Sequence, residues 1–308
     1  MRYLTTLIAG ILAISMLTGG VRAEEGFARR TLGWGHVFNN DYIGDGGDRW
    51  QTGSYFLSVL RGPRWTGDLP ERPFSVMEYR FGSSIIAPSD LVTPAAIDRR
   101  YVGRLHFGAN TYWQAHGAEL RLGLGAVTIG PDTGVSDLHG TFHRWISAPQ
   151  PLVAANELGN RIIPVISGEA AREYRLGATT IRPFVAARAG DEEILRAGVD
   201  LSFGPREGGA LWLRDEITGQ RYVGISGQDI APPWAFTLGA DAARVFGSDY
   251  FPAADGVAYE ETRYRARAGV NMRFGGLGLF YGATWQSEEF VGQPEGQVLG
   301  SLRLRMNF

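Results

Sequence analysis

The stretch "TRYRARAGVNMRF", residues 262–274, alternates between two kinds of side chain. One face carries Tyr264, Ala266, Ala268, Val270, Met272 and Phe274, and the other carries Arg263, Arg265, Arg267, Asn271 and Arg273. Residues 301–308 repeat the alternation, and a period of two is that of a β-strand. A polar face dominated by arginine opposite an apolar face with aromatic ends is typical of a transmembrane barrel strand.

Similar segments recur along the chain and give about twelve predicted strands, an even number as in bacterial single-chain barrels. They span residues 29–38, 51–61, 74–85, 100–112, 117–128, 165–177, 179–188, 192–203, 234–245, 260–273, 275–287 and 298–308. The stretch "LWLRDEITGQRYVGI", residues 211–225, is interpreted as a further hairpin within a long loop. The sequence therefore predicts an all-β fold, a transmembrane antiparallel barrel of outer-membrane type, with a short helical excursion after the fifth strand.

The first 23 residues have the pattern of a secretory signal peptide. One arginine precedes an apolar core from Leu4 to about Leu17, and Val21-Arg22-Ala23 resembles a cleavage site. We expect residues 24–308 to form a single barrel domain, which ends on Phe308 as outer-membrane barrels commonly do.

The amino-acid composition excludes several classes of function. The chain has no cysteine, which excludes thiol nucleophiles and zinc-thiolate sites, and its formal net charge of −2 gives no reason to expect nucleic acid as a partner. All 30 basic residues are arginine. We interpret the arginine rows of the strands as solvated or paired lumen charge rather than as substrate ligands.

Two segments interrupt the strand pattern with clustered polar groups. The first, "VFNNDYIGDGGDRWQTGSY" (residues 37–55), contains Asn40, Asp41, Asp45 and Asp48. Such oxygens can hold a hard cation such as calcium, although Asn-Asp and Asp-Gly are also common turn residues. Local sequence alone favours the turn.

The second segment, "GPDTGVSDLHGTFHR" (residues 130–144), holds two of the five histidines. His139 and His143 would share one face if residues 136–146 are helical. Such a pair can bind a transition metal, or one member can act as a general base, but zinc needs a third protein ligand that the spacing does not reveal. Two surface histidines on a loop helix are the simpler interpretation.

Together these segments resemble the outer-membrane lipid A 3′-O-deacylase family (LpxR-like). The resemblance rests on Asn40-Asp41, on "DRWQTGSY", on "DRRYVGRLHFG" (residues 98–108), and on "GAVTIGPDTG" (residues 125–134) with the downstream His143-Arg144. It runs from about residue 37 to residue 161.

The resemblance implies a twelve-stranded barrel that uses calcium to remove the 3′-acyloxyacyl group of lipid A near the extracellular face. Asn40 and Asp41 match the family's catalytic Asn-Asp pair, Thr52 its active-site threonine, and His143 its catalytic histidine. His139 stands where family members often have glutamine, and we count it among the candidate catalytic residues. Some members have a lysine near residues 87–97, for which Arg99 or Arg100 is the candidate replacement.

The chemistry of ester hydrolysis agrees with these assignments. His143 is a suitable base for water, and calcium held by Asp41 with Asn40 would polarise the ester carbonyl. No G-x-S-x-G elbow is present, so direct attack by water is favoured over an acyl-enzyme. The expected partners are lipopolysaccharide, outer-membrane lipids and the barrel-assembly machinery. A phospholipid esterase of related mechanism and a non-enzymatic pore or structural barrel remain the alternatives.

Overall fold

The computed structural model describes residues 29–95, 98–204, 208–227 and 233–306. The predicted signal peptide at residues 1–23 and the terminal Phe308 lie outside the described residues. No helix in the described part of the chain is long and apolar enough to cross a membrane.

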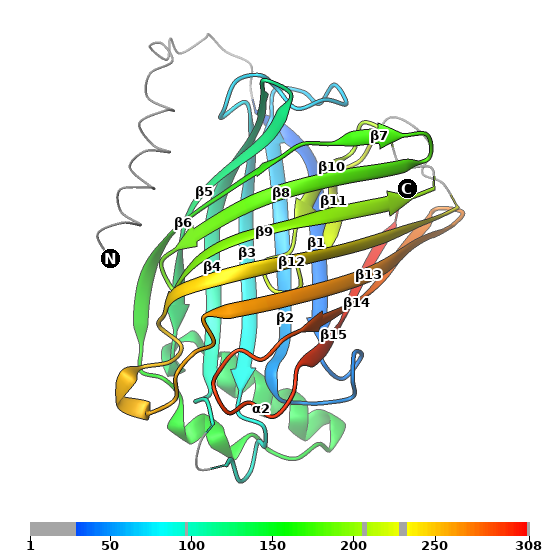
Figure 1. Cartoon of the computed structure of the whole chain (residues 1–308). Coiled ribbons are helices and arrows are strands. Elements are labelled where there is room, and N and C mark those ends of the chain that lie inside the picture. Colours follow the sequence, from blue (N-terminus) through cyan, green and yellow to red (C-terminus); the bar gives the residue numbers. More distant parts are fainter. Residues whose placement is uncertain (1–28, 96–97, 205–207, 228–232, 307–308) are drawn as a thin grey trace.

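Twelve antiparallel strands close into a barrel, as the sequence predicts (Figure 1). In chain order they are β1 (Arg30–Asn40), β2 (Trp50–Gly62), β3 (Val76–Ala87), β4 (Val102–Ala115), β5 (Ala118–Ile129), β6 (Arg161–Ala171), β8 (Thr179–Ala189), β9 (Glu192–Phe203), β12 (Trp234–Ser248), β13 (Thr262–Phe274), β14 (Leu277–Gln286) and β15 (Gln297–Met306). Each pairs with its neighbour in sequence, β1 pairs with β15, and β6 pairs with β8.

One predicted strand is shorter than expected. The chain turns after β6, and the short β7 (Tyr174–Leu176) pairs only with β8, where the sequence predicted a single strand over residues 165–177. The alternation in β13 is confirmed, because Arg263, Arg265 and Arg267 are buried while Tyr264 is exposed. Aromatic and aliphatic side chains likewise face outward on other strands, among them Trp34, Tyr55, Phe81, Phe107, Leu124, Val185, Phe236, Tyr281 and Leu304. This apolar exterior is the lipid-facing surface of an outer-membrane barrel.

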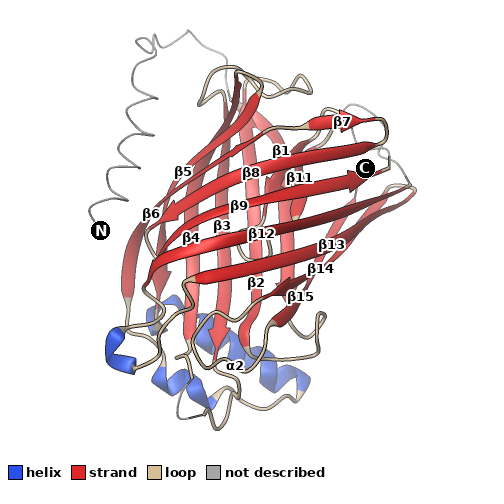
Figure 2. Cartoon of the chain, viewed as in Figure 1, coloured by secondary structure: helices blue, strands red, loops and turns tan. Residues whose placement is uncertain are grey.

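The two ends of the barrel differ. The end that holds the start of β1 and the end of β15 has tight turns such as residues 116–117 and 275–276. Most of the longer connections lie at the opposite end, including the helix α2 (Val135–Ile146) with the 3₁₀ turns η1 (Pro131–Thr133), η2 (Leu152–Asn156) and η3 (Ala253–Asp255) (Figure 2). Long loops mark the extracellular end of such barrels. The helix after β5 confirms the predicted excursion.

The connection between β9 and β12 folds back into the lumen. The predicted hairpin forms as β10 (Leu211–Arg214) and β11 (Arg221–Ile225). Leu213 and Tyr222 pack with Phe56, Leu60 and Val76 of the barrel wall. Gly33 of β1 permits this approach, because a Cβ there would lie 2.3 Å from the carbonyl oxygen of Gly224. The hairpin therefore fills much of the barrel interior.

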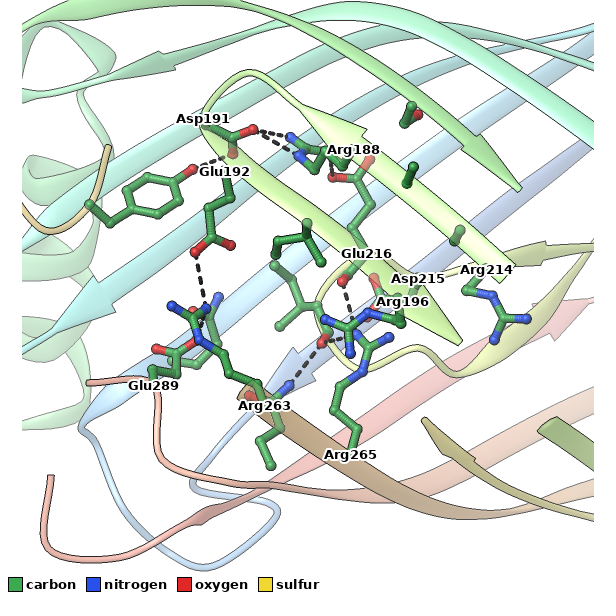
Figure 3. Close-up of a pocket in the computed structure, with 18 of the residues that line it drawn as sticks. Arg188, Asp191, Glu192, Arg196, Arg214, Asp215, Glu216, Arg263, Arg265 and Glu289 are labelled. Atoms are coloured by element: carbon green, nitrogen blue, oxygen red, sulfur yellow. Dashed lines mark hydrogen bonds and ion pairs between the residues drawn. The ribbon is translucent and has the colours of Figure 1, made fainter. Parts of the chain in front are cut away.

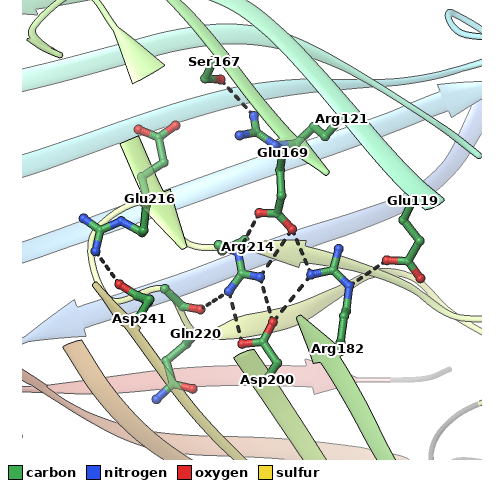
Figure 4. A network of polar contacts seen from close by, with 12 residues as sticks. Glu119, Arg121, Ser167, Glu169, Arg182, Asp200, Arg214, Glu216, Gln220 and Asp241 are labelled. Atoms are coloured by element: carbon green, nitrogen blue, oxygen red, sulfur yellow. Dashed lines mark hydrogen bonds and ion pairs between the residues drawn. The ribbon is translucent and has the colours of Figure 1, made fainter. Parts of the chain in front are cut away.

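Ion pairs fasten the hairpin to the wall. Arg214 lies 2.7 Å from Glu169 of β6 and 2.7 Å from Asp200 of β9, and Arg182 of β8 joins both carboxylates (Figure 4). Within the wall itself, Asp241 of β12 contacts Arg196 of β9 and Arg265 and Arg267 of β13. These contacts support the interpretation of the arginine rows as paired lumen charge.

A cavity of about 170 Å³ remains between the hairpin tip and the loops of the extracellular end (Figure 3). Charged side chains such as Arg188, Asp191, Glu216, Arg263 and Glu289 line it. An apolar cluster covers the wall at this end, with Trp50, Val102, Ile129, Tyr250 and Phe290 among its members.

Candidate functional site

The loop between β1 and β2 winds around Asp41. The Asp41 carbonyl oxygen accepts hydrogen bonds from the backbone N–H groups of Gly44, Asp45 and Gly46, and its Oδ2 accepts one from Arg49 N at 2.7 Å. Asp41 N in turn donates to Thr52 O at 3.1 Å. The loop thereby holds the Asp41 carboxylate beside the first residues of β2.

Two buried oxygens, one at the start of this loop and one in the adjoining strand β2, have no hydrogen-bond partner among the described residues. They are Asp41 Oδ1 and Thr52 Oγ1, and both residues are almost fully buried. Burial raises the pKa of Asp41 to about 8, and the carboxylates of Asp48 and Asp45 add to the rise. A buried anion without a partner is costly unless a cation lies beside it. The pair has the oxygen chemistry that calcium prefers.

Thr52 sits at an irregularity of β2. The register with β3 shifts between Gln51 and Gly53, so Thr52 is the extra residue of a bulge. Trp50, two residues earlier, is buried and has a φ of 49°, in the left-handed region. Such a conformation costs a non-glycine residue about 1–3 kcal/mol and is concentrated at functional sites. Bulges also re-aim side chains next to active sites.

Asn40 spans the same two segments. Its Nδ2 donates to Thr52 O at 3.0 Å, and its Oδ1 accepts from Tyr42 N at 3.0 Å. The amide therefore ties the end of β1 to the start of β2. The amide oxygen can still accept one further contact, because a carbonyl has two lone pairs.

The helix α2 carries both candidate histidines on its buried face. Gly134 and Ser147, each in the left-handed conformation, cap its ends. Glycine adopts this conformation without steric strain because it has no Cβ. His139 and His143 are one turn apart and their ring centroids lie 4.2 Å from each other. The predicted shared face is thus present, and both rings are buried.

Each imidazole makes one hydrogen bond through Nδ1. His143 Nδ1 lies 2.5 Å from Pro149 O, and His139 Nδ1 lies 3.0 Å from the Tyr101 hydroxyl. A carbonyl oxygen can only accept, so His143 Nδ1 carries the proton and Nε2 has the free lone pair when the ring is neutral. Burial and the neighbouring His143 lower the pKa of His139 to about 4, which keeps His139 neutral at physiological pH.

Asp48 joins the loop to the helix. Its Oδ2 lies 3.2 Å from His143 Nε2, and its Oδ1 lies 3.9 Å from His139 Nε2. Burial raises the pKa of the Asp48 carboxyl, and the charge of His143 opposes that rise. The ligand atoms of Asp48, His139 and His143 all lie within 4.8 Å of one another, so this buried group could hold a metal ion.

Two features of the site were missed in the sequence. The sequence places Asp48 among the loop carboxylates, and the histidine spacing does not reveal that Asp48 completes a group with His139 and His143 that could hold a metal ion. Tyr101 and Pro149 orient the two rings, and no local motif marks either of them. Arg99 and Arg100, the candidate replacements for a lysine, are engaged elsewhere: Arg99 contacts Glu289, and Arg100 donates to Glu157 O at 2.7 Å.

With this geometry in view, comparison with known proteins is informative. A family model described as "Outer membrane protein LpxR" matches residues 7–192, which is more than half of the chain. The chain belongs to the LpxR family. It is thus an outer-membrane β-barrel of the family that the sequence motifs indicate.

The solved structure of LpxR from Salmonella typhimurium has the same fold as this LpxR-family chain. It matches with a TM-score of 0.73 and 18% identity over 91% of this chain and 100% of that chain. The β domain of the Bordetella autotransporter BrkA matches with a TM-score of 0.40 and 12% identity, over 89% of this chain and 98% of that one. A comparison with the curated proteins found no significant match.

Proposed function

We propose that this LpxR-family barrel is a lipid A 3′-O-deacylase that hydrolyses the 3′-linked acyloxyacyl ester with the help of calcium. Family membership supports the substrate class. The observation that carries the proposal is His143, whose Nδ1 is fixed by Pro149 O and whose Nε2 is thereby left as a base.

Neighbouring groups orient His143 and favour its protonation. His143 is buried on α2, and the hydrogen bond to Pro149 O selects one tautomer and one ring orientation. Asp48 lies 3.2 Å from Nε2 and stabilises the positive charge that the ring gains when it takes a proton. A positioned general base of this kind contributes about 10²–10⁴-fold to a rate.

The residues around Asp41 fit a calcium ion. Asp41 Oδ1 and Thr52 Oγ1 are buried and have no hydrogen-bond partner among the described residues, and the Asn40 amide oxygen keeps one free lone pair. When bound there, calcium would supply Lewis-acid polarisation of the ester carbonyl. Asp41 provides the negative charge that retains the cation, and Asn40 fixes the spacing between the ends of β1 and β2.

The proposed reaction is a hydrolysis of the 3′-linked ester. Water attacks the ester carbonyl carbon while His143 Nε2 takes its proton. The bond between that carbon and the sugar oxygen then breaks, and the same proton passes from Nε2 to the leaving oxygen. The products are the free acyloxyacyl acid and lipid A with a 3′-hydroxyl group.

The exposed flank of α2 supports a lipid substrate. Leu138, Phe142, Trp145 and Ile146 lie on the helix surface beside the histidine face, and Trp145 is 81% exposed. An amphipathic helix with such a face lies at a membrane interface. This flank would hold the acyl chains of an outer-leaflet lipid close to the site that contains His143.

The test is to incubate the purified barrel with defined lipid A, with calcium or with a chelator, and to analyse the products by mass spectrometry. We expect loss of the 3′ acyl groups only with calcium, and none with His143→Ala. A matched control is His116→Asn, at the exposed β4–β5 turn of the opposite end, where φ is 51° and asparagine is tolerated.

Two further measurements distinguish the proposed function from the alternative functions. Acyl release from phospholipid but not from lipid A would indicate the related phospholipid esterase. Ion conduction in planar bilayers with unchanged lipid A would indicate a pore. The lumenal hairpin and its ion pairs argue against a wide pore.

A further inference from the structure

A second cation site lies next to the proposed calcium ligands, and its donor atoms are of a different kind. His139 Nε2, His143 Nε2 and the Asp48 carboxylate converge from α2 and from the β1–β2 loop. Two imidazoles and one carboxylate form the ligand set of zinc sites that keep one position for water. Calcium instead selects oxygen ligands alone.

The hydrogen bonds behind the two rings match those of metal-binding histidines. Such histidines almost always use the remaining ring N–H in a hydrogen bond that fixes the tautomer. His143 does so with Pro149 O at 2.5 Å, and His139 meets the Tyr101 hydroxyl at 3.0 Å. A phenol oxygen can accept as well as donate, so Tyr101 permits the tautomer in which His139 Nε2 has a free lone pair.

The burial of Tyr101 and the exposure of Asp48 also favour the binding of a metal ion. Tyr101 is fully buried in a small apolar cluster with Ala87, Leu91 and Val153, which fixes its hydroxyl. The Asp48 side chain remains 37% exposed, which gives an ion access from solvent.

We propose that Asp48, His139 and His143 bind a zinc-class divalent ion, and that this ion inhibits the esterase. The inhibitory half rests on the proposed function, because the ion engages the Nε2 lone pair that His143 needs as a base. The binding half stands on the geometry alone.

Binding is tested with cobalt(II) as a spectroscopic probe. The purified, chelator-treated barrel is titrated with Co²⁺, visible absorption is recorded, and Zn²⁺ is then added. We expect one Co²⁺ per chain, displacement by Zn²⁺, and no displacement by calcium. The variant His139→Gln should lower the affinity by more than about 100-fold, because a direct ligand outweighs outer contacts worth 10–100-fold.

Matched variants make this result specific. Tyr101→Phe keeps the ring but removes the contact with His139, and we expect it to weaken Co²⁺ binding by about 10-fold. His116→Asn should bind Co²⁺ like the unmodified protein. Heat-modifiable migration on a gel checks that each variant is folded. Absence of a Co²⁺ spectrum, or binding that survives His139→Gln unchanged, overturns the site.

Inhibition is tested with lipid A and saturating calcium. One equivalent of Zn²⁺ should abolish most of the hydrolysis, and a chelator selective for zinc should restore it. Hydrolysis that persists with zinc bound, or that zinc supports without calcium, overturns the inhibitory half. If the barrel hydrolyses no lipid A at all, that half falls with the proposed function, while the Co²⁺ spectrum still decides the site.

Discussion

Asp241 in the lumen and Asp41 at the extracellular mouth are both buried aspartates of the same barrel, but their partners differ. Asp241 contacts Arg196, Arg265 and Arg267. Asp41 has no ion pair within the described ranges, and one of its oxygens has no hydrogen-bond partner there. The lumen charges are paired with one another and hold the structure, whereas the Asp41 carboxylate is buried without an ion pair among the described residues, which supports the cation proposed there.

The largest expected effect concerns stability. Asp241→Asn leaves the buried Arg265 and Arg267 and the half-buried Arg196 without their common carboxylate, and breaking such a network costs about 3–5 kcal/mol. Asp41→Asn should show no such loss in calcium-free buffer at pH 7. The pKa of Asp41 is about 8 in the folded protein against 3.8 for an ordinary aspartate, so folding takes up a proton there, which costs stability above pH 3.8. Asparagine removes that cost.

Urea unfolding of the lipid-reconstituted barrel, followed by tryptophan fluorescence, measures this difference. The midpoint for Asp41→Asn should equal or exceed that of the unmodified protein without calcium, and added calcium should raise only the latter. Equal losses in the two variants would mean that Asp41 is held by partners of the lumen type.

The next effect concerns activity. Asp41→Asn should reduce lipid A hydrolysis about 10²–10³-fold, the usual effect of removing a group that stabilises the oxyanion. The response to calcium should disappear with it. Asp137→Asn is the control, because Asp137 is an exposed carboxylate at the start of α2 and should change little. Calcium-dependent activity that persists in Asp41→Asn would move the calcium site elsewhere.

The barrel itself was predictable because its signal is local. The alternation in residues 262–274 assigns each side chain to the lumen or to lipid before any contact is known, and β13 confirms it. The hairpin at residues 211–225 was also visible, but its insertion into the lumen was not. That insertion depends on Gly33 and on ion pairs with distant strands such as Asp200 of β9.

The candidate site was predictable only in part for the same physical reason. His139 and His143 lie one turn apart, so their shared face follows from helix geometry. Asp48 meets them only because the β1–β2 loop folds against α2, a contact between segments about 90 residues apart.

A third prediction uses pH to sharpen the contrast between the two aspartates. Protons and calcium compete for Asp41, whose pKa is about 8 without metal. The calcium concentration at half-maximal activity should therefore rise about tenfold for each pH unit below 8. Titrations of calcium at pH 6, 7 and 8 measure this slope. A flat calcium requirement over this range would mean that Asp41 does not bind the ion.

The smallest expected effect concerns the apolar flank of α2. Leu138 is 68% exposed beside the histidines, and Leu176 of β7 is 63% exposed at the opposite end of the barrel. If the flank of α2 meets the acyl chains of the substrate, Leu138→Ser loses roughly 1 kcal/mol of contact, which raises KM about fivefold and leaves kcat unchanged. Leu176→Ser should change neither constant, because it lies away from the mouth.

Kinetics with lipid A dispersed in a fixed phospholipid vesicle measure the two variants side by side. A rise in KM for Leu138→Ser alone would assign the flank to substrate binding, since general loosening of the barrel in the membrane would affect both leucines. If both variants rise equally, the flank anchors the protein without selecting its substrate. A fall in kcat for Leu138→Ser would instead indicate that the flank positions His143, because the two residues share α2 and are little more than one turn apart.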